Sequence, residues 1–260
     1  MNSIKNYNSG GTEEQFGYEW SEYNEIIDNY KNQFKKWIYP FKLQNFVGKN
    51  FMDAGCGIGR NSYWPLQTGA KSCFAFDFDI RTVNVAKKNL INFKNAKIKY
   101  LSIYDLQIRN KYDIVFSIGV IHHLKFPHKA VKNLYNALKP EGTLILWVYA
   151  REGNQKKLIV INLLRFITKK LPIYLKKIIS KILSYILWIS LKIYSSSPYF
   201  KLMKTFSLRH LESIILDQLI PVIANYWTKD EVLGLIKNLK FHNVEIHHTN
   251  KMSWTLICKK

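Results

Sequence analysis

The chain has 260 residues and a formal net charge of +21, from 39 basic and 18 acidic residues. This length suits one domain with an added segment, and 47% hydrophobic with 15% aromatic residues excludes a wholly disordered protein. Three cysteines without metal-type spacing indicate a reduced, cytoplasmic setting. Because no run of eighteen apolar residues is uninterrupted, we expect no transmembrane helix.

Short apolar runs alternate with helical patterns over residues 46–150. Alternation at this rhythm predicts an α/β fold, with a mostly parallel, doubly wound sheet between two layers of helices. The predicted strands are 51–54, 72–77, 98–103, 112–118 and 143–150, and the predicted helices are 81–93 and 127–140.

The pattern changes after Tyr149 into a basic helical segment, 151–225. Residues 151–210 hold thirteen Lys or Arg against one acid, Glu152. Three interpretations remain open: a helical lid over the acceptor, a lid that also contacts anionic lipid through 156–194, or a nucleic-acid surface. Because the lysines alternate with Ile and Leu, we rank the lid first, an inner-membrane-surface contact second and nucleic acid last. Nucleic acid is therefore expected to be an improbable partner.

The last part, 226–260, returns to α/β rhythm. Thr228 and Glu231 have the spacing of a capping box, and the helix that follows is expected to run towards Lys240. Two strands then form a hairpin that completes the sheet. The expected parts are 1–45 as an N-terminal lid segment, 46–150 as the core, 151–225 as a cap and 226–260 as the final helix and hairpin.

A glycine-rich loop follows the first predicted strand. Asp53 ends the apolar run, and Gly55, Gly57 and Gly59 follow at alternate positions. A dinucleotide-binding loop would have its third glycine where this chain has Arg60. A carboxylate at Asp53 would also oppose a pyrophosphate, whereas it suits an ammonium or sulfonium group. The loop therefore predicts a cationic ligand.

Five segments in order, "DAGCGIGRN", "CFAFDFD", "LSIYDL", "DIVFSIGVIHHL" and "LKPEGTLIL", resemble the motifs of class I S-adenosylmethionine-dependent methyltransferases, and the type 11-like subgroup in particular. The resemblance implies a seven-stranded Rossmann-like sheet and S-adenosylmethionine as the cofactor. It implies that Asp77 binds the ribose hydroxyls and that Phe78 packs against the adenine. Ser102 occupies the position where many relatives carry Asp. The implied cofactor-binding residues are Asp53, Gly55, Cys56, Gly57, Gly59, Asp77, Phe78, Ser102, Ile103 and Ile118.

Two histidines follow the fourth predicted strand on the ligand side. Methyl transfer needs a base only when the acceptor is a hydroxyl or a protonated amine. His123 is our preferred acceptor-side group and His122 the second, while the alternative is that both only line the pocket. His247 and His248 lie on alternate faces of a late strand, so we expect no metal site.

The segments 16–23 and 216–231 also resemble the subgroup, and they imply the acceptor side. Tyr18 and Trp20 would close over the cofactor, or else pin the first helix. Asp217 would contact the acceptor, or else pair with the basic segment. The expected reaction is methylation of a small molecule, such as a sugar or lipid-linked intermediate. The alternatives are a membrane-surface lipid or quinone methyltransferase, an RNA methyltransferase and a non-catalytic S-adenosylmethionine-binding protein.

Overall fold

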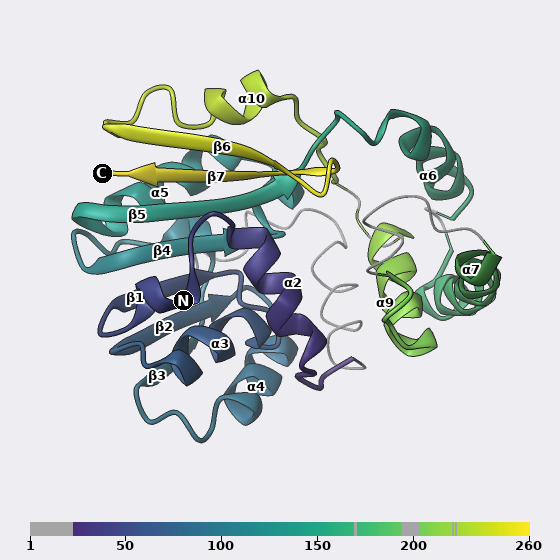
Figure 1. Ribbon diagram of the computed structural model, residues 1–260, viewed down its shortest axis with the longest axis horizontal. Coiled ribbons are helices and arrows are strands. Elements are labelled where there is room, and N and C mark those ends of the chain that lie inside the picture. The colour runs from purple at the N-terminus through teal and green to yellow at the C-terminus, as the bar shows by residue number, and fades with distance from the viewer. Residues whose placement is uncertain (1–22, 169–170, 194–202, 220, 222) are drawn as a thin grey trace.

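A seven-stranded sheet forms the centre of the computed structural model (Figure 1), which describes residues 23–260 except 169–170, 194–202, 220 and 222. The strand order is β3-β2-β1-β4-β5-β7-β6. Strands β1 to β5 pair in parallel, and β7 is antiparallel to both its neighbours. The predicted seven-stranded, mostly parallel sheet completed by a C-terminal hairpin is confirmed. The strands are β1 Asn50–Ala54, β2 Ser72–Asp77, β3 Ala96–Tyr100, β4 Tyr112–Ile118, β5 Leu138–Tyr149, β6 Asn243–Thr249 and β7 Ser253–Lys259.

Helices cover both faces of this sheet, which explains why β4 is apolar along most of its length. On one face, α2, α3 and α4 pack through side chains such as Phe34, Trp64 and Ala86. On the other face, α5 and α10 pack through Leu134 and Val232. The bounds of these helices are α2 Asn29–Ile38, α3 Arg60–Thr68, α4 Ile80–Asn89, α5 Pro127–Ala137 and α10 Lys229–Gly234.

Some boundaries differ from those predicted. Helix α5 ends three residues before Pro140, because Leu138 already pairs with Tyr112 in the sheet. The predicted capping box is present, since Thr228 Oγ1 accepts the Glu231 N–H and Glu231 in turn accepts the Thr228 N–H. Helix α10 ends at Gly234 rather than near Lys240, and glycine is a weak helix former.

Three further helices lie beyond the carboxyl ends of the parallel strands (Figure 1): α6 Gln155–Thr168, α7 Ile173–Ile193 and α9 Leu208–Leu219. Their own small core contains Leu191, Met203, Phe206 and Leu211. Throughout the described part of the chain, no helix is both long and apolar enough to cross a membrane.

Candidate functional site

A cavity opens where the strand order reverses, between β1 and β4. In an open parallel sheet, ligands bind in the crevice outside the carboxyl ends of the strands at such a point. The cavity wall combines the loops after β1, β2, β3 and β4 with residues of α2, β5 and α9. Eight predicted cofactor-binding residues line it: Gly55, Cys56, Gly57, Asp77, Phe78, Ser102, Ile103 and Ile118.

The glycine loop has a backbone that side chains would not tolerate. Gly55, Gly57 and Gly59 have φ of 79°, 51° and 81°, the left-handed region that favours glycine. A Cβ on Gly55 would also collide with Val120. The loop can therefore bring its backbone close to a ligand. Burial raises the pKa of the Cys56 thiol well above its ordinary value, which fits a small filler rather than a reactive thiolate.

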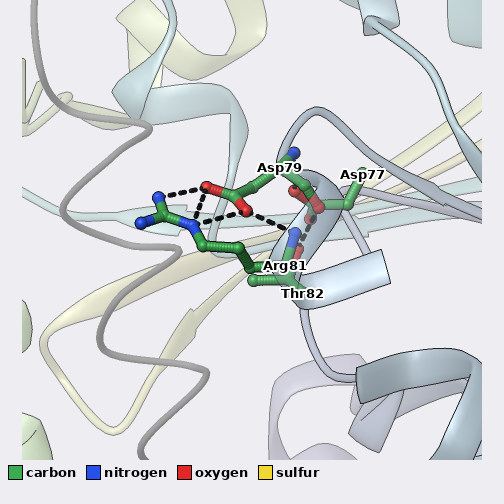
Figure 2. A network of polar contacts seen from close by, with 4 residues as sticks. All are labelled: Asp77, Asp79, Arg81 and Thr82. Atoms are coloured by element: carbon green, nitrogen blue, oxygen red, sulfur yellow. Dashed lines mark hydrogen bonds and ion pairs between the residues drawn. The ribbon is translucent and has the colours of Figure 1, made fainter. Parts of the chain in front are cut away.

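Asp77 ends β2 and lines the cavity. Figure 2 shows its side chain beside Asp79, Arg81 and Thr82. It accepts the backbone N–H of Gly57 at 2.8 Å and that of Asp79 at 3.1 Å. An ionised carboxylate has about four acceptor positions. Because the Thr82 side chain also interacts with this carboxylate, about one or two positions remain for the hydroxyls of a ribose. Burial raises the pKa of Asp77, while the two backbone hydrogen bonds lower it.

Asp79 has a structural task beside Asp77. Its carboxylate accepts the Arg81 N–H at 2.7 Å and so caps α4. The Arg81 guanidinium also pairs with it, with Nη2 and Oδ2 2.6 Å apart (Figure 2). The Arg81 guanidinium therefore forms its ion pair with Asp79.

Asp53 lies behind the glycine loop. It is 1% exposed, and Ser62 Oγ donates to its Oδ2 at 2.7 Å. Burial raises its pKa to about 7, with Asp77 adding to the increase and Ser62 opposing it. Gly59 is also behind the wall, where a Cβ would come within 3.0 Å of Leu90 Cδ1. Among the described residues, Asp53 and Gly59 are therefore not part of the cavity lining. Their direct contact with a ligand remains a prediction.

The raised pKa of Asp53 predicts a pH effect on stability in the absence of cofactor. The folded state holds this proton up to a pH of about 7, whereas the unfolded chain loses it near 3.8. Stability from this group therefore falls as pH rises through that window. Asp53→Asn cannot ionise, so its free energy of unfolding should rise relative to that of wild type by about 3 kcal/mol as the pH increases from 5 to 8. Urea unfolding at both pH values measures this gain.

The comparison needs a matched variant, because buried His122 and His123, with lowered pKa values, act in the opposite direction. Asp230→Asn, at an exposed acid in the first turn of α10, should give the same difference from wild type at both pH values. A constant difference for Asp53→Asn as well would contradict a buried, neutral Asp53.

The wall next to Asp77 is apolar and flat enough for a purine. Phe78 lines it and stacks on Tyr100, with ring centres 5.9 Å apart and planes at 22°. Ile103 and Leu101 lie on the same wall. The Ser102 hydroxyl accepts the Tyr104 N–H at 3.2 Å and caps a 3₁₀ turn, which gives it a local structural task.

The two histidines occupy different environments. They lie in a 3₁₀ turn, Ile121–His123, rather than in an α-helix. His123 lines the cavity, with its Nδ1 2.8 Å from the Ile223 carbonyl oxygen. His122 is fully buried, its ring centre 3.9 Å from that of Tyr149. Burial lowers the pKa of His123 to about 4 and holds the pKa of His122 well below its ordinary value. Both rings are therefore neutral at physiological pH.

Asp217 reaches the opposite end of the cavity from helix α9. It accepts the Tyr149 hydroxyl at 3.2 Å, and Gln218 Nε2 donates to that hydroxyl at 3.3 Å. Burial raises the pKa of Asp217, and the nearby Arg60 and Arg165 guanidinium groups lower it. Asp217 thus faces the cavity and also lies near basic groups. Contact with the acceptor and pairing with the basic segment both stay predictions.

Sequence reasoning missed three residues of this end: Trp37, Arg60 and Trp147. The two tryptophan rings are 4.8 Å apart, and the Arg60 guanidinium lies 5.5 Å from the Trp37 ring. They come from α2, α3 and β5, so only the fold brings them together. The predicted Tyr18 and Trp20 lie outside the described residues. Among the described residues, no group of three or more His, Cys, Asp or Glu is arranged to hold a metal ion.

Comparison with known proteins identifies the same segment. Residues 52–146 match the model of the family described as "Methyltransferase domain". They form a class I, S-adenosylmethionine-dependent methyltransferase domain. The site fits that cofactor, because Asp77 retains acceptor positions for ribose hydroxyls and Phe78 lies on an apolar wall suited to adenine.

Curated relatives of this methyltransferase domain include two tRNA U34 carboxymethyltransferases. The Nautilia profundicola protein is 28% identical over 137 residues, covering 50% of this chain and 44% of that protein. The Helicobacter pylori (strain Shi470) protein is 34% identical over 126 residues, covering 46% and 48%. The chain thus spans less than half the length of these relatives.

Solved structures share the fold over most of both chains. One is the complex of the Haloferax volcanii Trm112 methyltransferase activator with a methyltransferase, at TM-score 0.60 and 12% identity, covering 95% of this chain and 96% of that one. Another is a Listeria monocytogenes S-adenosylmethionine-dependent methyltransferase, at TM-score 0.52 and 14% identity, covering 89% and 98%. At these identities the likeness shows the fold alone.

The curated relatives overturn the partners expected from the sequence. The sequence predicts a small-molecule acceptor and an improbable role for nucleic acid, whereas the matching relatives act on tRNA by name. The error was to treat the alternation of lysines with Ile and Leu along the sequence as evidence against contacts with RNA phosphates. In a helix, Lys177 and Lys181 fall on one face although Ile178 and Ile179 lie between them in the sequence.

Proposed function

We propose that the protein transfers the methyl group of S-adenosylmethionine to a nucleoside of an RNA. The observation that carries this proposal is a single cavity with two chemically different ends. Asp77 and Phe78 line one end, from the sheet, and Asp217 of the lid helix α9 lines the other. A cofactor at the sheet end would therefore point its reactive group towards an acceptor held under the helices.

The acceptor end suits a planar base. The Trp37 and Trp147 rings supply aromatic surface, and stacking on a base is typically worth about 1–3 kcal/mol. Asp217 can accept a hydrogen bond from a base N–H, while the Arg60 side chain lies on the same wall as a donor. These side chains could orient a nucleoside without any contact to a metal.

His123 would hold the acceptor's proton. When its Nδ1–H donates to the Ile223 carbonyl, Nε2 is the basic nitrogen of the neutral ring. A neutral imidazole can take a proton from a hydroxyl or a protonated amine as the new bond forms. Shielding from water by the Trp37 and Trp147 side chains would favour the displacement.

An RNA acceptor is supported by two independent features. The curated relatives are tRNA-modifying enzymes by name, and residues 151–210 contain thirteen basic residues and one acid. Clustered Lys and Arg release counterions from phosphates and so bind RNA in a salt-dependent way. The proposal keeps the cytoplasmic location predicted from the sequence and requires no membrane contact.

The direct test is transfer of labelled methyl from S-adenosylmethionine, with total RNA and an RNA-free metabolite extract as separate acceptors. We expect label in RNA that ribonuclease releases, and nucleoside mass spectrometry showing a gain of one methyl group. Asp77→Ala serves as the cofactor-deficient control. Label confined to the metabolite extract would refute the RNA acceptor. A gain of one carboxymethyl group would refute the methyl donor.

A further inference from the structure

A second hollow lies between the lid helices α7 and α9, and we call it the lid groove. Tyr174, Lys177 and Lys181 of α7 line one side, and Arg209 and Glu212 of α9 line the other. Tyr23 lies beneath them and is 8% exposed. Three basic side chains against one acidic side chain give the groove a net positive charge.

The basic groups sit at regular positions. Lys177 and Lys181 are one helical turn apart, about 6 Å along α7, so they can contact neighbouring phosphates of one strand. Lys181 is exposed, and Tyr174 is 61% exposed. The Tyr174 ring therefore offers a face for stacking beside the two lysines, since it precedes Lys177 by three residues on the same helix face.

The opposite side of the groove is fixed by packing. The Arg209 guanidinium lies 5.6 Å from the Tyr23 ring centre, within the range of a cation–π contact. Tyr23 is itself packed with Leu216 of α9 and Ile173 of α7. An arginine held over an aromatic ring loses less conformational freedom when it binds a phosphate than a mobile one.

The lid groove and the cavity share helix α9. Arg209 is in the first turn of α9, and Asp217 lines the cavity eight residues later. At 1.5 Å per residue this separation is about 12 Å along the helix. Tyr30 lies between α9 and the cavity wall, because its ring centre is 5.2 Å from that of His210 and 4.9 Å from the Arg60 guanidinium. A strand in the groove would thus pass within a few nucleotides of the cavity.

We propose that the lid groove binds the phosphate backbone of a single-stranded RNA segment, with the Tyr174 ring against one base. This inference rests on the proposed function and adds where the RNA is held. A concave groove with basic walls can hold an RNA strand. A flat bilayer would instead contact a flat or convex surface of the protein. Phosphate contacts there would position the neighbouring nucleoside at the cavity without reading its sequence.

The test is RNA binding by a charge-reversal pair, Lys177→Glu with Lys181→Glu, in the full chain. The control pair, Lys87→Glu with Lys132→Glu, changes the net charge equally but lies at exposed positions of α4 and α5. Fluorescence anisotropy with a labelled single-stranded RNA over a series of salt concentrations should show at least tenfold weaker binding for the groove pair. The slope of log K against log salt should fall by about two, one for each lost phosphate contact. The control pair should stay within threefold of wild type.

Separate outcomes distinguish the groove from the proposed function. Wild type that neither binds nor methylates RNA refutes the proposed function. Wild type that methylates RNA, with a groove pair of unchanged KM and salt slope, refutes the groove alone. An equal loss in both pairs would mean general electrostatics and also refutes it. The last experiment is sedimentation with anionic vesicles. If the groove pair lost vesicle binding but kept its RNA binding, the groove would be a lipid-binding surface and the proposal would be refuted. S-adenosylmethionine affinity and thermal stability verify that each pair is folded.

Discussion

Asp77→Ala should weaken S-adenosylmethionine binding by at least tenfold. The wild-type residue lines the cavity, and about one or two of the four acceptor positions of its carboxylate are left for ribose hydroxyls after the Gly57, Asp79 and Thr82 interactions. Hydrogen bonds to a charged group contribute about 1.5–3 kcal/mol each, and about 1.4 kcal/mol already corresponds to a factor of ten. The alanine also releases the Gly57 N–H, so the glycine loop loses the bond that fixes it.

Titration calorimetry measures this loss, and two further variants separate its causes. Asp77→Asn retains an oxygen that can accept the Gly57 N–H but has no charge, so it should keep the loop in place and still bind the cofactor more weakly than wild type. Asp230→Asn removes a distant exposed acid and should bind normally. Unchanged affinity in Asp77→Ala would remove this residue from the site.

The sheet end of the site could be predicted because its signals are local. Asp77 at the end of a predicted strand and three glycines within residues 55–59 can be recognised in the sequence without knowing the fold. Asp53 shows the limit of such reading. The sequence gives its place at a strand end, but the depth of its carboxylate behind the loop depends on how α3 brings Ser62 over it.

The acceptor end could not be predicted in the same way. Trp37, Trp147 and Asp217 are separated by 70 or more residues in the chain, and only tertiary packing places them on one wall. The basic segment misled for a related reason. Its lysines and isoleucines alternate along the sequence, but this alternation does not show which of them are buried. In α7 the residues buried on the side towards α9 include Lys176 and Ser180, while Ile178 is exposed.

His123→Ala should lower turnover on the RNA acceptor by about 100-fold, the lower end of what general acid–base catalysis contributes. Cofactor affinity should change less than threefold, because Asp77 and the glycine loop carry that binding. His122→Ala should cost less turnover and more stability, since this ring is fully buried against Tyr149 and its loss leaves a cavity. Single-turnover rates, cofactor affinity and urea unfolding measure the three effects.

The pH dependence tests the base itself. The pKa of His123 is about 4, so the ring is already neutral at pH 6, and kcat/KM should be flat from pH 6 to pH 8 unless the acceptor titrates. A base with the ordinary histidine pKa near 6.5 would instead give a rise across that range.

His123→Asn separates proton transfer from anchoring. The Asn amide can still donate to the Ile223 carbonyl, as Nδ1–H of the histidine does, but it cannot take a proton. If His123 acts as the base, Asn should be as slow as Ala. If the ring only anchors the segment that leads from α9 into α10, Asn should restore most of the turnover. Small and equal losses in all the variants would mean that positioning alone drives the transfer, because a sulfonium donor needs no base when the acceptor is already nucleophilic.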